Sequence, residues 1–258
     1  MNRYGRYRVA FQAILIKEIL RFMRIWIQTV LPPVITTTLY YVIFGNLIGQ
    51  RIGQMDGFDY IDFIVPGLIL MAVITNSYAN VVSSFFSSKY QRHVEELLIS
   101  PVPNWVILAG YVGGGVARGL VVGVAVTGVS LFFTELSIHS YGWTFTVFVL
   151  TSILFALAGF INAIFANSFD DISIIPTFVL TPLTYLGGVF YSIQMLPSLW
   201  QKVSLANPVL YMVNTFRYGL LGVSDIPLGL ALGIILLFIV GLTAYSLFLL
   251  RRVVGIKS

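Results

Sequence analysis

Long apolar runs constrain this chain more than any other feature. An α-helix needs about 20 apolar residues to cross the roughly 30 Å of hydrocarbon in a bilayer. Six runs of suitable length lie near residues 27–48, 61–86, 105–134, 143–166, 174–191 and 227–250. The chain is 58% hydrophobic and only 10% charged, which is outside the usual range of a soluble domain. We therefore predict an all-α integral membrane protein with six transmembrane helices.

The stretch 192–226 is apolar but interrupted. Pro197, the pair Asn207-Pro208 and Gly222 divide it into pieces that are too short, at about 18–22 Å of helix, to cross a bilayer. Irregular backbone at membrane depth is tolerated only inside protein or beside a water-filled cavity. We predict two short re-entrant helices that enter from the outer face and return to it.

The distribution of Lys and Arg predicts the orientation. Cytoplasmic loops of membrane proteins carry an excess of these two residues. Most of the fifteen fall on one side of the predicted spans, at Arg3, Arg6, Arg8, Lys17, Arg21, Arg24, Lys89, Arg92, Arg251, Arg252 and Lys257. The opposite side holds Arg51, Lys202 and Arg217. We expect both termini in the cytoplasm and no removable signal peptide.

Residues 1–26 form an amphipathic segment. At 100° per residue Arg3, Arg6, Lys17, Arg21 and Arg24 fall on one side, opposite Leu15, Ile19, Phe22 and Trp26. The pattern predicts an interface helix on the cytoplasmic face, followed by a single transmembrane domain at 27–258. The helix could act only as an anchor to anionic lipid, or it could also contact a partner protein.

The residues give little support to catalysis. The chain has no cysteine and two histidines, which fall on opposite sides of the predicted membrane, so we expect no metal site and no bound cofactor. No glycine-rich phosphate loop is present. The adjacent carboxylates Asp170 and Asp171 could serve as a general base, but a solvated turn or a helix N-cap explains them as well. The net charge of +5 fits membrane orientation better than nucleic-acid binding.

Arg118 is the one strongly intramembrane charge. It lies in "YVGGGVARGL", well inside the third predicted span. An arginine at that depth should face a cavity or a partner rather than lipid. Alternatively, the helix could begin along the interface, so that Arg118 reaches the cytoplasmic surface. The neighbouring glycines indicate close helix packing rather than phosphate binding.

A charged segment, "KYQRHVEELLISPVP", separates the second and third runs. Tyr90, Val94 and Leu97 share one helical face, and Ser100-Pro101 ends the helix. A helix of about ten residues is marginal in water, so a protein groove that pairs with both charge signs would stabilise it. The alternative is a solvated connector.

The sequence resembles the permeases of type 2 ABC exporters, the ABC-2 family. "VEELLISPVP" looks like that family's cytoplasmic loop motif, and residues 176–222 resemble its late region, which has a Pro-Trp stretch, Asn-Pro-x-x-Tyr and a following Arg. Many members have a Gly-Thr pair before the acidic position. Here His93-Val94 precedes Glu95-Glu96, which leaves open which Glu takes that position.

The resemblance implies an ATP-driven exporter subunit in a bacterial inner membrane. Two copies of the chain would pair with each other and with two copies of a separate ATPase subunit that binds Mg-ATP. The segment 88–100 would be the coupling helix. Its contact residues would be Arg92, Glu95, Glu96, Leu97 and Leu98, and Asp170 and Asp171 would offer a second cytoplasmic contact.

The cargo would be amphipathic or lipid-like, because candidate pathway residues are mainly aromatic. These residues are Arg118, Phe178, Tyr185, Phe190, Tyr191, Tyr211, Phe216 and Arg217. The same aromatic residues could instead form an interfacial belt. Two other functions stay open: an ion-coupled transporter that needs no ATPase, and an intramembrane lipid-modifying enzyme that uses Asp170 or Asp171.

Overall fold

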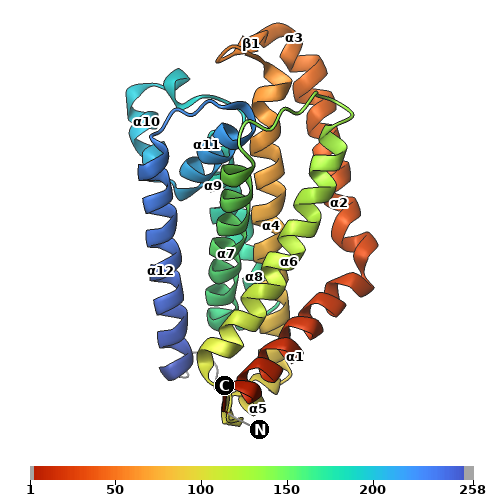
Figure 1. Cartoon of the computed structure of the whole chain (residues 1–258), viewed down its shortest axis with the longest axis vertical. Helices are drawn as coiled ribbons and strands as arrows, with labels where there is room; N and C mark the ends of the chain where they lie inside the picture. Colours follow the sequence, from red (N-terminus) through yellow and green to blue (C-terminus); the bar gives the residue numbers. More distant parts are fainter. Residues whose placement is uncertain (1–2, 253–258) are drawn as a thin grey trace.

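The computed structural model describes residues 3–252 and is almost wholly helical (Figure 1). Within that part, five helical runs are long and apolar enough to cross a membrane: Trp26–Ile52, Tyr60–Tyr90, Asn104–Ser130, Tyr141–Phe165 and Leu228–Arg252. Each begins and ends within a few residues of a predicted run. The prediction of an all-α, multi-pass membrane protein is confirmed. Lys257, assigned to the cytoplasmic tail, lies outside the described residues.

Helix α4 (Tyr60–Tyr90) is the centre of the bundle, and most of its side chains are buried. It packs mainly against α6 (Asn104–Ser130) and α7 (Tyr141–Phe165). Helix α1 (Arg3–Arg24) lies across α6. Helix α12 (Leu228–Arg252) packs on α7 and leaves its other side exposed. Everything else in the fold is attached to this α4–α6–α7 core.

The first long run is not a uniform helix. α2 (Trp26–Tyr40) contains Pro32 and Pro33, and it continues as the π-helix η1 (Tyr41–Ile48) and the short α3 (Gly49–Ile52). Proline lacks the N–H of the helical ladder, so α2 loses two consecutive backbone hydrogen bonds. The run is mostly exposed and contacts α6 and α4.

A small hairpin follows α3. Strand β1 (Gln54–Met55) pairs antiparallel with β2 (Phe58–Asp59). The two turn residues, Asp56 and Gly57, have φ of 52° and 83°. Asp-Gly favours this left-handed pair, because Gly has no Cβ and Asp tolerates positive φ. The hairpin returns the chain directly into α4.

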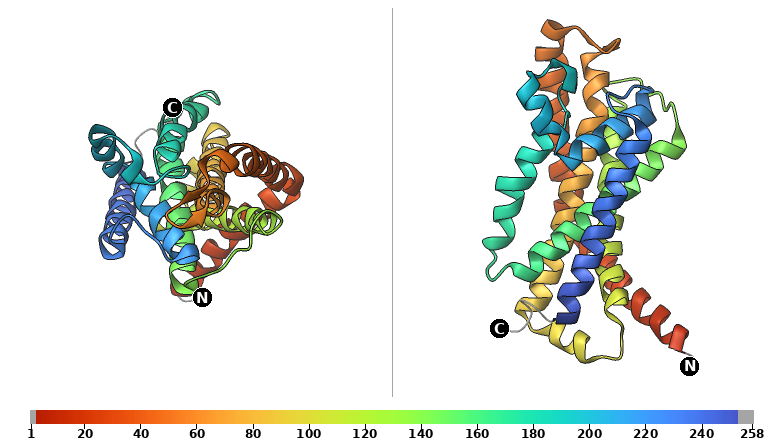
Figure 2. Two further views of the ribbon diagram at one scale, coloured as in Figure 1. Left: turned by 90° about the horizontal axis from the view of Figure 1, so that it is seen from above. Right: turned by 90° about the vertical axis from the view of Figure 1, so that its left-hand side faces the viewer.

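The predicted fifth run, 174–191, contains no single long helix. A helical stretch of α8 (Asp171–Ile175), the π-helix η2 (Pro176–Leu180) and α9 (Thr181–Tyr185) takes its place and stands at the side of the bundle (Figure 2). Pro176 interrupts the regular ladder, and Gly188, at φ 74°, turns the chain after it. The six-span count therefore stays a prediction.

Two short helices follow, at the positions where the prolines and glycine break the sequence. After the 3₁₀ turn η3 (Ile193–Met195), α10 (Ser198–Leu205) starts behind Pro197, and α11 (Pro208–Leu221) ends at Gly222. Asn207 caps α11: its Oδ1 accepts a hydrogen bond from Val209 N at 2.9 Å.

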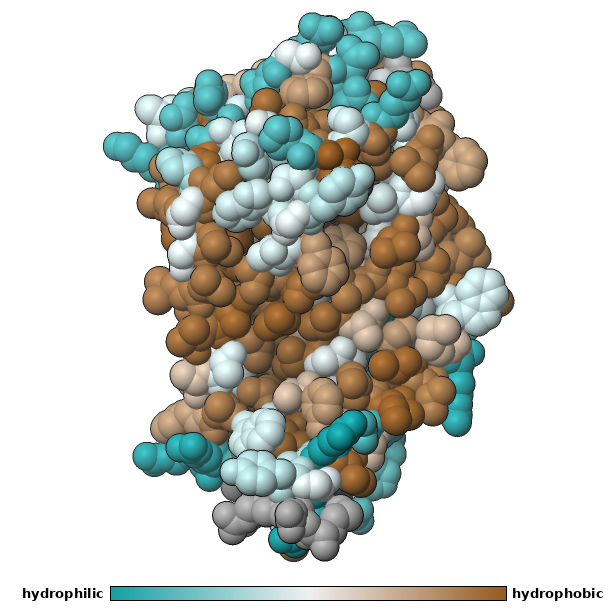
Figure 3. Space-filling model, viewed as in Figure 1, coloured by the Kyte–Doolittle hydropathy of each residue, from teal (hydrophilic) through white to brown (hydrophobic). Residues whose placement is uncertain are grey.

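The molecule has two polar ends and an apolar middle. The start of α1, the end of α12 and the helix α5 lie together at one end, called the basic end below (Figure 1). The hairpin, α3 and α10 lie at the other, the distal end. The space-filling view shows hydrophobic residues in a broad band between hydrophilic ends (Figure 3), as expected for a protein in a bilayer.

Glycines allow the core helices to approach closely. A Cβ added at Gly159 of α7 would lie 2.5 Å from the carbonyl oxygen of Tyr78 on α4. A Cβ at Gly115 of α6 would lie 2.5 Å from Val81 Cγ2. Small residues at such crossings bring backbones together where lipid gives no hydrophobic drive for association.

We therefore expect Gly159→Ala to destabilise the protein, because the new methyl group meets α4 backbone that cannot rotate away. Overpacking of this kind costs about 1–3 kcal/mol. Gly128→Ala on α6, where an added Cβ meets nothing within 4 Å, is the matched control and should leave stability unchanged or slightly raised. Thermal unfolding in detergent measures both, and equal midpoints would contradict the packing argument.

Candidate functional site

The segment predicted to dock on a partner forms a short helix at the basic end. α4 ends at Tyr90, Arg92 takes a left-handed conformation with φ 63°, and α5 (His93–Ile99) follows. Ser100 is extended before Pro101, which stops the helix. The Arg92 conformation is unfavourable for a residue with a Cβ, so the sharp change of direction is held by its surroundings.

α5 has an inner face and an outer face. Val94 is 1% exposed, and Leu97 and Leu98 pack against the core. On the outer side, Arg92 and Glu96 are exposed, and Ile99 is 87% exposed. A large apolar side chain that points into solvent between charges is a feature of interaction surfaces.

The predicted contact residues therefore separate into two groups. Arg92 and Glu96 lie on the outer face and Glu95 is half-buried, whereas Leu97 and Leu98 fasten α5 to the body. Sequence reasoning missed His93 and Ile99, both exposed on α5. The helical spacing of Glu96 and Ile99, at i and i+3, is the signal that could have identified this face.

α5 is attached to a firmly held part of α4. Lys89 Nζ donates hydrogen bonds to the carbonyl oxygens of Ile164 and Ala166, at 2.6 and 2.7 Å, at the end of α7. A cation here satisfies carbonyls that have no helical partner and interacts favourably with the helix dipole. The rings of Phe86 and Tyr90 lie against Phe169 in the following turn.

Asp171 caps that turn. Its Oδ2 accepts hydrogen bonds from the backbone N–H groups of Asn167 and Ser168, and Ser168 Oγ accepts one from Asp171 N–H. These bonds, led by the one from Asn167, lower the pKa of Asp171 below its ordinary value. A carboxylate with a lowered pKa is a poor general base, and it has a structural use already. Asp170 is exposed beside it.

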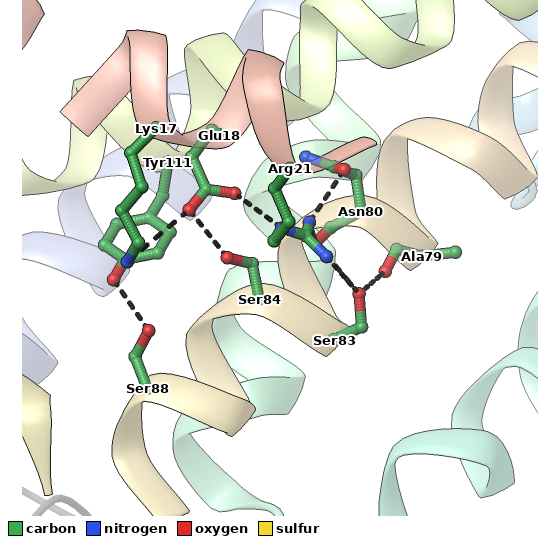
Figure 4. Close-up of polar contacts among 9 residues, drawn as sticks. All are labelled: Lys17, Glu18, Arg21, Ala79, Asn80, Ser83, Ser84, Ser88 and Tyr111. Atoms are coloured by element: carbon green, nitrogen blue, oxygen red, sulfur yellow. Dashed lines mark hydrogen bonds and ion pairs between the residues drawn. The ribbon is translucent and has the colours of Figure 1, made fainter. Parts of the chain in front are cut away.

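A buried polar network fastens α1 to α4 (Figure 4). Glu18 is fully buried; Ser84 Oγ donates to its Oε1 at 2.7 Å, and Arg21 Nε lies 3.4 Å from its Oε2. Arg21 Nη2 donates to both the carbonyl oxygen and Oδ1 of Asn80, at 2.8 Å each. We call Glu18, Arg21, Asn80 and Ser84 the α1–α4 lock.

The lock changes the interpretation of the amphipathic segment. Ile14, Glu18 and Phe22 form the buried face of α1, whereas Ile16 and Leu20 are about half exposed. Arg21, grouped by sequence with the surface cations, turns into the protein. Glu18 is the single acid in an otherwise basic helix, a signal that sequence reasoning did not use.

Arg118 lines a cavity. The cavity has a volume of about 350 Å³, lies between α2, α4 and α6, and is open at exposed residues of α2. Arg118 is near the middle of α6, and its Nη2 donates to Asn76 Oδ1 of α4 at 3.2 Å. Of the two alternatives for this residue, the structure has the one that faces a cavity. The cavity is lined by Gln28, Thr29, Pro32, Pro33, Thr36, Thr37, Tyr40, Leu68, Met71, Ala72, Thr75, Asn76, Ala79 and Arg118.

Arg217 is buried elsewhere, inside the distal end. It is 1% exposed, its guanidinium carbon lies 3.8 Å from the centre of the Phe63 ring, and its Nη2 donates to the Gly188 carbonyl oxygen at 2.6 Å. Phe216 stacks on Phe148 beside it, also buried. Arg217 thus holds the turn at Gly188 and lines no cavity with Arg118.

The other aromatic candidates do not form one surface. Tyr185 and Phe190 stack on each other, and Tyr185 Oη lies 2.7 Å from Tyr40 Oη on α2. Tyr211 is buried and donates to the Leu205 carbonyl oxygen. Tyr191 is half-buried, and Phe178 is 73% exposed on η2. Only the Tyr40–Tyr185–Phe190 group borders the cavity, through Tyr40.

Comparison with known proteins places these features in a family. The ABC-2 type transporter family matches residues 9–221. The inner membrane transport permease YadH of Escherichia coli K12 is 60% identical over 252 residues, which cover 98% of each chain. Nodulation protein J of Rhizobium meliloti is 25% identical over 239 residues, which cover 92% of this chain and 90% of its own length. This chain therefore belongs to the ABC-2 type transporter family.

Proposed function

We propose that this transport permease is the membrane subunit of an ATP-driven exporter. Two copies work as a homodimer with a separate ATPase subunit in a bacterial inner membrane. The observation that carries the proposal is the outer face of α5, where Glu96 and Ile99 are exposed on a helix whose inner face is anchored, with Arg92 exposed just before it. Such a surface fits a protein groove that has both charged and apolar parts.

The energy for transport comes from the partner in this proposal. Mg-ATP is bound and hydrolysed there, and this chain has no catalytic role. When the ATPase pair closes, it pushes α5, and the push reaches α4 directly because Lys89 and the rings around Phe169 hold that end of α4 on α7. The α1–α4 lock carries the same displacement to α1.

The proposed topology has six spans, with both termini in the cytoplasm. The fifth span is the predicted run 174–191, in which the helical stretch ends at Tyr185 and the chain continues to the turn at Gly188, and 192–226 enters and leaves from the outer face. Exposed apolar side chains along 171–185, including Ile174, Phe178 and Val179, support contact with a second copy or with lipid. The excess of Lys and Arg at the basic end supports the orientation.

The cargo is amphipathic or lipid-like. The cavity beside α2 combines apolar side chains such as Leu68 and Met71 with polar ones such as Gln28 and Asn76. Pockets that recognise small molecules are mostly apolar with a few placed polar groups.

Charge reversal at α5 tests the docking surface. Glu96→Lys should reduce copurification of the ATPase subunit and lower substrate-stimulated ATP hydrolysis by about tenfold, since a like charge at a docked position costs more than 1 kcal/mol. Glu135→Lys, an exposed acid beyond the other end of α6, is the matched control. Normal activity of Glu96→Lys in a reconstituted complex would contradict the proposal. So would cargo transport driven by an ion gradient in vesicles that contain the permease alone.

Breaking the α1–α4 lock should separate docking from coupling. Glu18→Ala removes the carboxylate that Arg21 and Ser84 contact and costs about 1–3 kcal/mol, because partly buried polar groups lose a partner. We expect the ATPase subunit still to copurify while its hydrolysis no longer responds to cargo. Gln12→Ala, at an exposed position of the same helix, should behave as wild type. Full coupling in folded Glu18→Ala would show that α1 does not transmit the push.

Thiol labelling tests the topology, since the natural chain has no cysteine. Single cysteines at the exposed positions Gln91, Ser137 and Lys202 report on the basic end, the α6–α7 connection and α10. A membrane-impermeant reagent should label S137C and K202C in spheroplasts, and Q91C only after lysis. Labelling of K202C only after lysis, as expected for Q91C, would refute the re-entrant arrangement.

A further inference from the structure

The cavity between α2, α4 and α6 contains an uncompensated positive charge. Arg118 pairs with no carboxylate among residues 3–252, and no acidic residue lines the cavity. Within the described residues its side chain makes one hydrogen bond, to Asn76, and its Nε is buried without a partner. A guanidinium has five N–H donors in a fixed plane, so most of its capacity is unused.

The contrast with the other buried ionic groups is informative. Glu18 has Ser84 and Arg21. Arg217, whose Nε also lacks a partner, has the Gly188 carbonyl and packs its guanidinium on the Phe63 ring, away from the cavity. A cation in a membrane span is expensive unless it is paired or meets water or a ligand. Arg118 lies near the middle of α6 and lines a cavity. Its position suits an anion that enters the cavity.

The rest of the cavity suits an attached chain. Leu68, Met71 and Ala72 give it an apolar wall along α4, while Gln28 and Thr36 add side-chain donors from α2. Its volume of about 350 Å³ is at the lower end of the range for small-molecule sites. That space accommodates a head group and the first part of an alkyl chain, with the remainder reaching lipid past the exposed side of α2.

We propose that this cavity binds an amphiphile through its anionic group, a phosphate or carboxylate, with Arg118 as the counter-ion and Asn76 orienting the guanidinium. This proposal rests on the proposed function: the amphiphile is either the cargo itself or a membrane lipid that occupies the cavity before the cargo enters. The anion forms charge-assisted hydrogen bonds with the guanidinium fork, and the chain is sheltered between α2 and α4.

The binding experiment uses the purified permease in an uncharged detergent, without the ATPase. The probes are dodecyl phosphate, dodecylphosphocholine and inorganic phosphate, measured by equilibrium dialysis. We expect dodecyl phosphate to bind at least about tenfold more tightly than either other probe, and Arg118→Gln to remove that preference, since one charge-assisted pair is worth about 1.4 kcal/mol or more. Arg51→Gln, which removes an exposed charge on α3, should bind as wild type.

Two further variants separate binding from folding. Arg118→Lys keeps the charge and should retain part of the preference. Thr75→Trp fills the cavity from an exposed position of α4 without changing any charge, and should weaken dodecyl phosphate binding by a similar factor. Equal binding of dodecyl phosphate to wild type, Arg118→Gln and Thr75→Trp overturns the inference. Binding of inorganic phosphate as tightly as dodecyl phosphate also overturns it, because the dodecyl chain would then contribute nothing to affinity.

Native mass spectrometry identifies the source of the ligand. If phosphatidylglycerol is retained from vesicles and phosphatidylcholine is not, and Arg118→Gln loses it, a membrane lipid is the amphiphile. If dodecyl phosphate binds and phosphatidylglycerol does not, the site takes a single-chain molecule. Failure of all anionic probes overturns this inference while leaving the ATPase-coupling tests of the proposed function unaffected.

Discussion

Hydrocarbon offers no hydrogen bonds, and this constraint explains how the polar groups of the protein are arranged. A charge that the fold buries needs partners within the chain or, as at Arg118, a cavity that admits water or a ligand. Lys89 donates to the last carbonyls of α7, and Arg217 donates to the Gly188 carbonyl. Glu18 accepts from Ser84 and forms an ion pair with Arg21. Apart from the Glu18–Arg21 pair within α1, each contact joins elements that are distant in sequence. The polar contacts therefore fix how apolar helices, which could slide on one another, are positioned.

The same constraint explains how much of the fold could be predicted. Bilayer thickness sets the length of an apolar run, so the bounds of five helical runs follow from composition within a few residues. The fifth predicted run failed as a single long helix because Pro176 and the turn at Gly188 shorten it, and hydropathy does not register backbone geometry. The breaks at Pro197, Asn207 and Gly222 were predictable because proline and glycine act locally.

The candidate site was less predictable, because the directions of side chains depend on tertiary contacts. Helical spacing grouped Arg21 with surface cations, yet Asn80 on α4 draws it inward. The Leu97-Leu98 pair suggested a docking face, but its apolar side chains pack on the body and leave Ile99 outside. The two alternatives for Arg118 could not be separated until the position of α2 and α4 around it was known.

The attachment of Lys89 to α7 has a mechanical consequence. α4 has 31 residues and is therefore about 46 Å long at 1.5 Å per residue. Its basic end is held on a neighbouring helix, so a displacement there is carried along α4 toward its distal end. A tilt of about 5° would displace its far end by roughly 4 Å at this helical rise. Tyr60, whose hydroxyl holds the Phe190 carbonyl, stands at that end, so a modest rocking motion at α5 would strain the aromatic contacts around Tyr185 first.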